Sequence, residues 1–195
     1  MAKLHFKYGA LNSSKTANLL MTAHNYREKD SKVLLLQSSK NIRTGASKIT
    51  SRVGLESNCI VFNDNTNLKE LILNRDVAPE VVLIDEIQFA TVKQIDELVE
   101  IVDNCGITVI TYGLKSTYTG DLFPATAKLF VVADKIEEIK QICMFCDKKA
   151  FMNLKVKDNK PVYSGEIISI GDVKQSEEYY IPVCRKHFYN PPIWD

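Results

Sequence analysis

Residues 8–16 (Tyr-Gly-Ala-Leu-Asn-Ser-Ser-Lys-Thr) constrain the fold of this chain more than any other segment, because they nearly match a phosphate-binding loop. That motif requires a glycine, four residues, a second glycine, a lysine, and a serine or threonine. Gly9, Lys15 and Thr16 fit, whereas Ser14 takes the place of the second glycine. In the intact motif, backbone N–H groups surround phosphate oxygens, the lysine reaches the terminal phosphates, and the hydroxyl holds Mg²⁺. The loop therefore predicts a site for a nucleoside triphosphate.

The residues on either side of this loop have the pattern that the motif requires. Residues 4–8 alternate between apolar and polar side chains, which predicts a strand. Residues 16–28 carry apolar side chains at helical spacing, which predicts a helix whose N-terminus favours an anion. An ordinary polar turn between a strand and a helix explains the loop alone equally well. The predicted phosphate-binding residues are Gly9, Asn12, Ser13, Ser14, Lys15 and Thr16.

A second signal is the apolar run 81–84, which is followed directly by Asp85 and Glu86. Such a run is typical of a strand that is buried on both faces of a parallel sheet. Open α/β sheets bind ligands at the C-terminal ends of their strands, where these carboxylates stand. We predict that Asp85 holds Mg²⁺ through water and that Glu86 is free to act as a general base. An acidic turn after a core strand is the alternative, and the upstream loop disfavours it.

A third signal indicates a metal site. Cys143 and Cys146 form a C-x-x-C pair, and Cys184 and His187 form a C-x-x-H pair. Three thiolates and one imidazole are a normal ligand set for a structural zinc ion. Disulfides are an alternative, but the cysteine count is odd and we expect no secretory segment. A redox C-x-x-C is a third interpretation, which leaves the second pair unexplained.

The spacing of the two pairs predicts a loop with a function of its own. Residues 147–183 separate them, whereas a compact zinc ribbon has roughly 15–20 residues there. We expect a long loop that the metal ties at its base and that covers the nucleotide site as a substrate lid. Cys59 and Cys105 lie in apolar stretches and are predicted to be buried thiols.

The remaining pattern predicts an α/β fold with a parallel sheet covered by helices. Residues 38–58 are polar and are expected to form a mobile loop. We predict an α/β nucleotide-binding domain over 1–141, a zinc-anchored lasso or lid domain over 142–190, and a tail over 191–195. The further predicted strands are 33–37, 59–62, 107–111 and 129–133, and the further predicted helices are 68–74 and 91–104.

Five segments in this order resemble the type II thymidine kinases, a family of zinc-containing deoxynucleoside kinases. They are the loop 9–16; Asp-Glu-Ile-Gln-Phe at 85–89; Tyr-Gly-Leu at 112–114 with Tyr118; Ile-Gly-Asp at 170–172 with Tyr180; and Cys-Arg-Lys-His at 184–187. The resemblance implies transfer of the ATP γ-phosphate to the 5′-hydroxyl of thymidine, with Glu86 as the base. It implies structural zinc, Mg²⁺ bound with ATP, thymidine triphosphate as a feedback inhibitor, and a homotetramer. The substrate-binding residues that it implies are Leu11, Gln88, Phe89, Leu114, Tyr118, Ile170 and Tyr180.

Three departures from the family pattern lie at the phosphate end. The family usually has glycine at Ser14, methionine at Leu11, and Asp-x-Arg where this chain has Asn41 and Arg43. A side chain at Ser14 obstructs close approach to phosphate, and Asn41 lacks a negative charge near the metal. Two rival functions therefore stay open: a thymidine-binding protein with weak or no transfer, and a zinc-bearing ATPase that thymidine does not stimulate.

Composition excludes several other classes. The 195 residues carry a formal net charge of +1, which gives no electrostatic footprint for nucleic acid. No apolar run approaches the ~20 residues that span a bilayer, and the N-terminus lacks the apolar core of a signal peptide. We therefore expect a cytoplasmic protein without a membrane or nucleic-acid partner.

Overall fold

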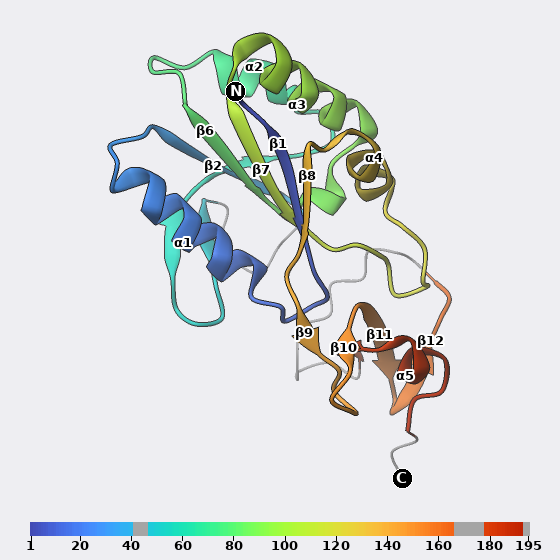
Figure 1. Cartoon of the computed structure of the whole chain (residues 1–195). Helices are drawn as coiled ribbons and strands as arrows, with labels where there is room; N and C mark the ends of the chain where they lie inside the picture. Colours follow the sequence, from blue (N-terminus) through green and yellow to red (C-terminus); the bar gives the residue numbers. More distant parts are fainter. Residues whose placement is uncertain (41–46, 166–177, 193–195) are drawn as a thin grey trace.

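The computed structural model describes residues 1–40, 47–165 and 178–192. Its centre is a six-stranded sheet in the order β5-β2-β6-β7-β1-β8, and every pairing in it is parallel (Figure 1). The predicted α/β fold with a parallel sheet is confirmed. The six strands are β1 (Leu4–Tyr8), β2 (Val33–Ser38), β5 (Ile60–Phe62), β6 (Val81–Asp85), β7 (Thr108–Gly113) and β8 (Lys135–Glu138).

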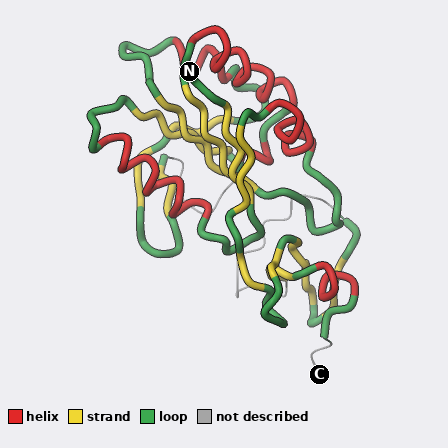
Figure 2. Tube along the Cα trace, in the orientation of Figure 1, coloured by secondary structure: helices red, strands yellow, loops and turns green. Residues whose placement is uncertain are grey.

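Helices cover both faces of this sheet, and this explains why its central strands are apolar throughout. Successive side chains of a strand point to opposite faces. Leu83 of β6 packs in the core beneath α1, whereas Val82 and Ile84 pack in the core beneath the other three helices. Figure 2 shows α1 on one side of the sheet and the remaining long helices on the other. The helices are α1 (Lys15–Arg27), α2 (Leu68–Leu73), α3 (Val92–Cys105) and α4 (Pro124–Val132).

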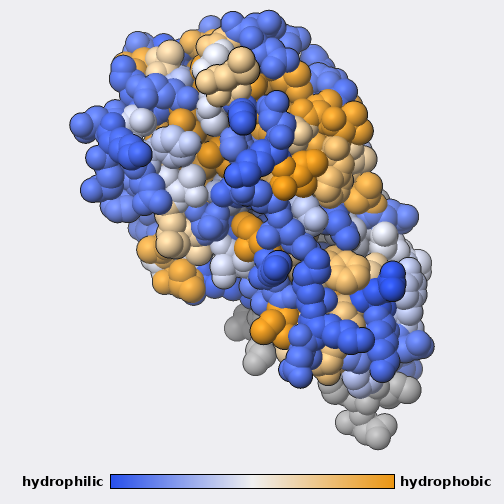
Figure 3. All heavy atoms as spheres, viewed as in Figure 1, coloured by the Kyte–Doolittle hydropathy of each residue, from blue (hydrophilic) through white to orange (hydrophobic). Residues whose placement is uncertain are grey.

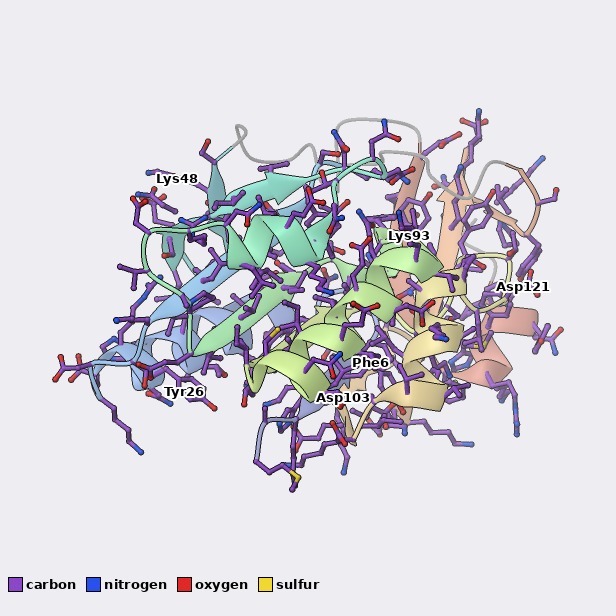
Figure 4. All side chains as sticks on the ribbon, turned by 90° about the horizontal axis from the view of Figure 1, so that it is seen from above. Phe6, Tyr26, Lys48, Lys93, Asp103 and Asp121 are labelled. Atoms are coloured by element: carbon purple, nitrogen blue, oxygen red, sulfur yellow. The ribbon has the colours of Figure 1, made fainter. Side chains whose placement is uncertain are left out.

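Local signals set the ends of α3. The Thr91 hydroxyl accepts a hydrogen bond from the Gln94 N–H at 3.2 Å, and the Gln94 side chain accepts one from the Thr91 N–H. This capping box begins the helix. Gly106 ends it in the left-handed conformation, with φ 68°. Figure 4 labels Phe6 of β1, which is fully buried, and Lys93 and Asp103 of α3, of which the Lys93 side chain is exposed.

A second group of elements lies beyond one end of the sheet (Figure 1). It has its own apolar core, which includes Leu154, Val156, Val183 and Phe188. The predicted domain boundary falls between residues 141 and 142, within the short strand β9. The division into two domains stays a prediction. The elements of this group are β9 (Gln141–Ile142), β10 (Lys149–Ala150), β11 (Met152–Lys157), β12 (Lys160–Val162), β13 (Glu178–Val183) and α5 (Arg185–Tyr189).

The strand predicted at 129–133 was wrong, because these residues form the end of α4 and its C-cap Ala133. Pro124 at the first turn fixes a helical φ, and α4 then buries Ala125 and Leu129 against the sheet. A short apolar run cannot be assigned to strand or helix by periodicity alone. The edge strand is instead β8, whose residues are mostly charged.

Three further expectations need correction. Residues 38–58 contain the antiparallel hairpin of β3 (Lys48–Thr50) and β4 (Glu56–Asn58), which buries Ile49. The described part of 147–183 is largely the antiparallel sheet β12-β11-β13 and not a loop. Cys105 is exposed at the end of α3, and Cys59 is only half-buried.

Among the described residues, no helix combines the length and apolar character that crossing a membrane requires.

Candidate active site and metal centre

The loop 9–14 joins β1 to α1 and wraps around the Lys15 ammonium. Lys15 is buried, and its Nζ donates a hydrogen bond to the Ala10 carbonyl at 2.7 Å and lies 3.3 Å from the Gly9 carbonyl oxygen. Gly9 is required by close packing, since a Cβ there would lie 2.6 Å from the carbonyl oxygen of Ile139. The loop thus holds a cation at the N-terminus of a helix, which is an arrangement suited to anions.

Ser14 has an unusual backbone conformation. It is the N-cap of α1 with φ 60° and ψ 27°, and its side chain makes no capping hydrogen bond. The left-handed region costs a residue with a Cβ roughly 1–2 kcal/mol, which glycine avoids. The glycine of the motif is therefore favoured at this position by backbone conformation as well as by room for a phosphate.

Two residues that we predicted to hold Mg²⁺ lie in direct contact. The Thr16 hydroxyl donates a hydrogen bond to Asp85 Oδ2 at 2.9 Å, across 69 positions of sequence. Asp85 is buried at the C-terminal end of β6. Burial and the neighbouring Glu86 carboxylate raise the pKa of Asp85 to about 7. The hydrogen bond from Thr16 and the positive charge of Lys15 lower this pKa, but the two raising effects are larger. A divalent cation beside Asp85 would favour its ionised form.

Glu86 is held at the end of β6 by a tight turn. Its backbone is left-handed, with φ 54°, and its N–H donates to Asp85 Oδ1 at 3.0 Å. The Gln88 amide nitrogen donates to Glu86 Oε2, while the Gln88 amide oxygen accepts from the Leu114 N–H at 3.0 Å. Gln88 therefore links the carboxylate to the end of β7, and the short helix η1 (Ile87–Phe89) carries this link.

Glu86 and the phosphate loop line one hollow of about 150 Å³. The same hollow is also lined by Ser51, Arg52 and Val53, in the turn that connects β3 to β4. The predicted general base thus faces the predicted phosphate site. From the sequence alone, Arg52 is either a solvated loop charge or an arginine that lies above the phosphate site; the structure places it at the hollow.

Three of the residues implied for nucleoside binding, Phe89, Tyr118 and Tyr180, belong to aromatic pairs. The rings of Phe89 and Phe123 lie 5.9 Å apart, and those of Tyr118 and Tyr180 lie 6.0 Å apart, both in edge-to-face geometry. Phe123 was not among the predicted site residues. Three predicted site residues, Ile170, Asn41 and Arg43, lie outside the described residues.

The second group of elements contacts the middle of the phosphate loop. The side-chain oxygen of Asn153, a buried residue of β11, accepts a hydrogen bond from the Leu11 N–H at 2.8 Å. The Gln141 amide donates to the Asn12 carbonyl at 3.0 Å, and Ala10 packs in the apolar core of the second group. No motif indicated Asn153 or Gln141, because these contacts span about 130 positions or more.

The structure gathers the four predicted metal ligands into one cluster, with all ligand atoms within 4.8 Å of one another. His187 Nδ1 lies 3.3 Å from Cys143 Sγ and 3.6 Å from Cys184 Sγ. Cys146 Sγ lies 3.9 Å from Cys184 Sγ. Four such ligands around tetrahedral zinc stand roughly 3.5–3.8 Å apart, so the cluster could hold zinc.

Backbone N–H groups donate hydrogen bonds to sulfur atoms of this cluster. The Phe145 N–H donates to Cys143 Sγ at 3.5 Å. Burial alone would raise the pKa of Cys184, but hydrogen bonds from the His187 backbone and from the other two thiols lower it below its ordinary value. The pKa of Cys146 is instead raised: the hydrogen bond from the Lys148 backbone lowers it, but burial and the two neighbouring thiols outweigh that effect.

Comparison with known proteins identifies the family. The family model for thymidine kinase matches residues 2–188. The chain belongs to the thymidine kinase family.

It is 45% identical to the thymidine kinase of Lactiplantibacillus plantarum, over 98% of both chains. It is 44% identical to that of Enterococcus faecalis, over 98% of this chain and 96% of the relative. For the thymidine kinase of Lactococcus lactis the identity is 41%, over 99% of this chain and the whole relative. The resemblance stated from five segments is confirmed, and it extends over nearly the full length.

Proposed function

We propose that this protein is a thymidine kinase that transfers the γ-phosphate of ATP to the 5′-hydroxyl of thymidine. Similarity to thymidine kinases over nearly the whole chain is the observation that carries the proposal. The geometry supports it, because a cationic loop, a buried carboxylate and a half-buried carboxylate meet at one end of a parallel sheet. Phosphoryl transfer depends mainly on positioning and on stabilising charge, which such a site supplies.

Each residue has a role in this proposal. Lys15 and the loop N–H groups bind the phosphates, and Thr16 and Asp85 would hold Mg²⁺. When bound there with ATP, Mg²⁺ would supply positive charge beside the phosphate oxygens. Glu86 accepts the proton of the 5′-hydroxyl as that oxygen attacks, and Gln88 keeps the carboxylate oriented through its hydrogen bond.

At the nucleoside end, the proposal assigns the thymine ring to Leu11, Phe89, Leu114, Tyr118 and Tyr180. The two edge-to-face pairs offer aromatic surface of the kind that stacks on a base. Ile170 as a contact of the base, and Asn41 and Arg43 as phosphate-side residues, stay predictions. So does the lid, whose expected function is to exclude water that would hydrolyse ATP.

The remaining parts of the proposal concern the assembly and its environment. We propose structural zinc at the Cys143 cluster, feedback inhibition by thymidine triphosphate, a homotetramer and a cytoplasmic location. Exposed apolar side chains support association: Val131 of α4 is 81% exposed and Ile136 of the edge strand β8 is 41% exposed. Figure 3 shows apolar atoms gathered on the side of the molecule where α4 lies.

Release of ADP from Mg-ATP, measured with and without thymidine, tests the proposed function. We expect release that depends on thymidine and yields thymidine monophosphate. Release that thymidine does not stimulate would indicate an ATPase. Thymidine binding by calorimetry without any turnover would indicate a binding protein whose phosphate end has lost activity.

Replacing Ser14 by glycine is expected to improve the phosphate end. The change relieves the left-handed serine backbone and removes the Cβ at a position where the motif's backbone must come close to phosphate. We expect kcat/KM for ATP to rise roughly two- to tenfold, the equivalent of about 0.4–1.4 kcal/mol. Thymidine affinity should stay unchanged. Steady-state kinetics with each substrate varied in turn provide the measurement.

Asp30→Gly is the matched control for this substitution. Asp30 has φ 59° and follows the other end of α1, so glycine relieves the same backbone conformation away from the loop. It should change thermal stability alone. A lower kcat/KM for ATP in Ser14→Gly would mean that the serine hydroxyl takes part in the site.

A further inference from the structure

Lys155 lies at the centre of a cluster of charged and aromatic side chains on the sheet β12-β11-β13. In the antiparallel register of β11 and β13, Lys155 lies opposite Tyr180 and Lys157 lies opposite Glu178. Side chains two positions apart in a strand point to the same face. These four side chains therefore share one face, against which the Tyr118 ring packs, 6.0 Å from that of Tyr180.

The Lys155 ammonium contacts both tyrosine rings. Its Nζ lies 5.0 Å from the ring centroid of Tyr118 and 5.9 Å from that of Tyr180. A cation within about 6 Å of an aromatic centroid is attracted by the face of the ring. Glu178 Oε2 stands 3.0 Å from the same Nζ, so the charge is paired although the Lys155 side chain is only 9% exposed.

Lys157 provides a comparison within the same cluster. Its Nζ lies 3.1 Å from Glu178 Oε1, but its side chain is 50% exposed. Within the described ranges, the cation–ring contacts of this cluster belong to Lys155 and not to Lys157. The two lysines therefore share a carboxylate and differ in whether they contact the aromatic pair.

We propose that Lys155 is a positioning residue, which holds the rings of Tyr118 and Tyr180 in a fixed orientation for the nucleoside. The inference rests on the proposed function, in which these two tyrosines contact the thymine ring. One buried cation that attracts both ring faces restricts how each ring rotates. Without it, the rings lose one of the contacts that orient them, and that part of their ordering would have to occur when the nucleoside binds, at a cost in affinity.

Calorimetric titration of Lys155→Met, Lys155→Arg and Lys157→Met with thymidine, and separately with Mg-ATP, tests the proposal. Methionine keeps the apolar stem and removes the charge, whereas arginine keeps the charge. We expect thymidine to bind Lys155→Met about tenfold more weakly, which is roughly the cost of ordering one or two side chains on binding. Affinity for Mg-ATP should change by less than about twofold, a difference that binding measurements barely resolve. Lys155→Arg should regain most of the loss, and Lys157→Met should match the parent.

Three outcomes contradict the proposal. Equal thymidine affinity in Lys155→Met and Lys157→Met would overturn it. So would a Lys155→Met variant that binds both thymidine and Mg-ATP more weakly and melts at a lower temperature, because that result indicates a merely structural role. A parent that binds no thymidine would overturn it together with the nucleoside assignment. A parent that binds thymidine but transfers no phosphate would contradict the proposed function alone, and the comparison of variants would still decide the role of Lys155.

Discussion

Replacing Glu86 by glutamine is expected to lower kcat by about 10²–10⁴-fold, the usual cost of removing a general base. Glutamine has the same shape, and its amide oxygen can still accept the hydrogen bond that the Gln88 amide donates. The turn at the end of β6 should therefore stay intact, while the proton of the 5′-hydroxyl loses its acceptor. Single-turnover kinetics with saturating Mg-ATP and thymidine measure the transfer step directly.

Binding measurements separate this effect from a loss of structure. Thymidine affinity of Glu86→Gln should stay near that of the parent, because the aromatic pairs are unchanged. Glu100→Gln is the matched control: Glu100 lies on α3, pairs with Lys69 at 2.6 Å, and its side chain is 50% exposed. It should keep parental kcat. A near-parental kcat in Glu86→Gln would show that Glu86 is not the base.

Replacing Cys143 by serine is expected to abolish metal binding and to unfold much of the second group of elements. A structural zinc site of this type contributes about 10–16 kcal/mol of apparent binding free energy, which is folding free energy for the segment around it. The parent should contain one zinc ion per chain by elemental analysis, and Cys143→Ser should contain none. Its melting temperature should fall accordingly.

The loss should also reach the phosphate end. Asn153 and Gln141 hold the backbone of Leu11 and Asn12, so disorder of the second group removes two hydrogen bonds from the loop. We expect the KM for ATP to rise in partly metal-depleted protein and to recover when zinc is restored. Cys105→Ser is the matched control, since Cys105 is exposed at the end of α3 and lies outside the cluster. Purified parent without zinc, prepared without chelators, would refute the assignment.

Local patterns predicted most of the fold. The strand at 4–8 and the core strand that ends at Asp85 follow from residues that are neighbours in sequence, and both are observed. The helix after the phosphate loop is observed within one residue of its predicted ends. The prediction failed at 129–133, where an apolar run fits a strand and a helix equally well. Only packing against the sheet decides between them, and this requires the strand order.

The sequence by itself determined the chemistry that contiguous motifs carry: a lysine in a phosphate loop, two carboxylates after a buried strand, and two metal half-sites. Each of these depends on spacings of a few residues, which the local backbone geometry preserves. The tertiary structure alone decided how the parts are joined. Asn153 reaches Leu11 across 142 positions, and Lys155 contacts both Tyr118 and Tyr180. Such contacts depend on strand order and register, which arise from burial of the whole apolar core and not from any single segment.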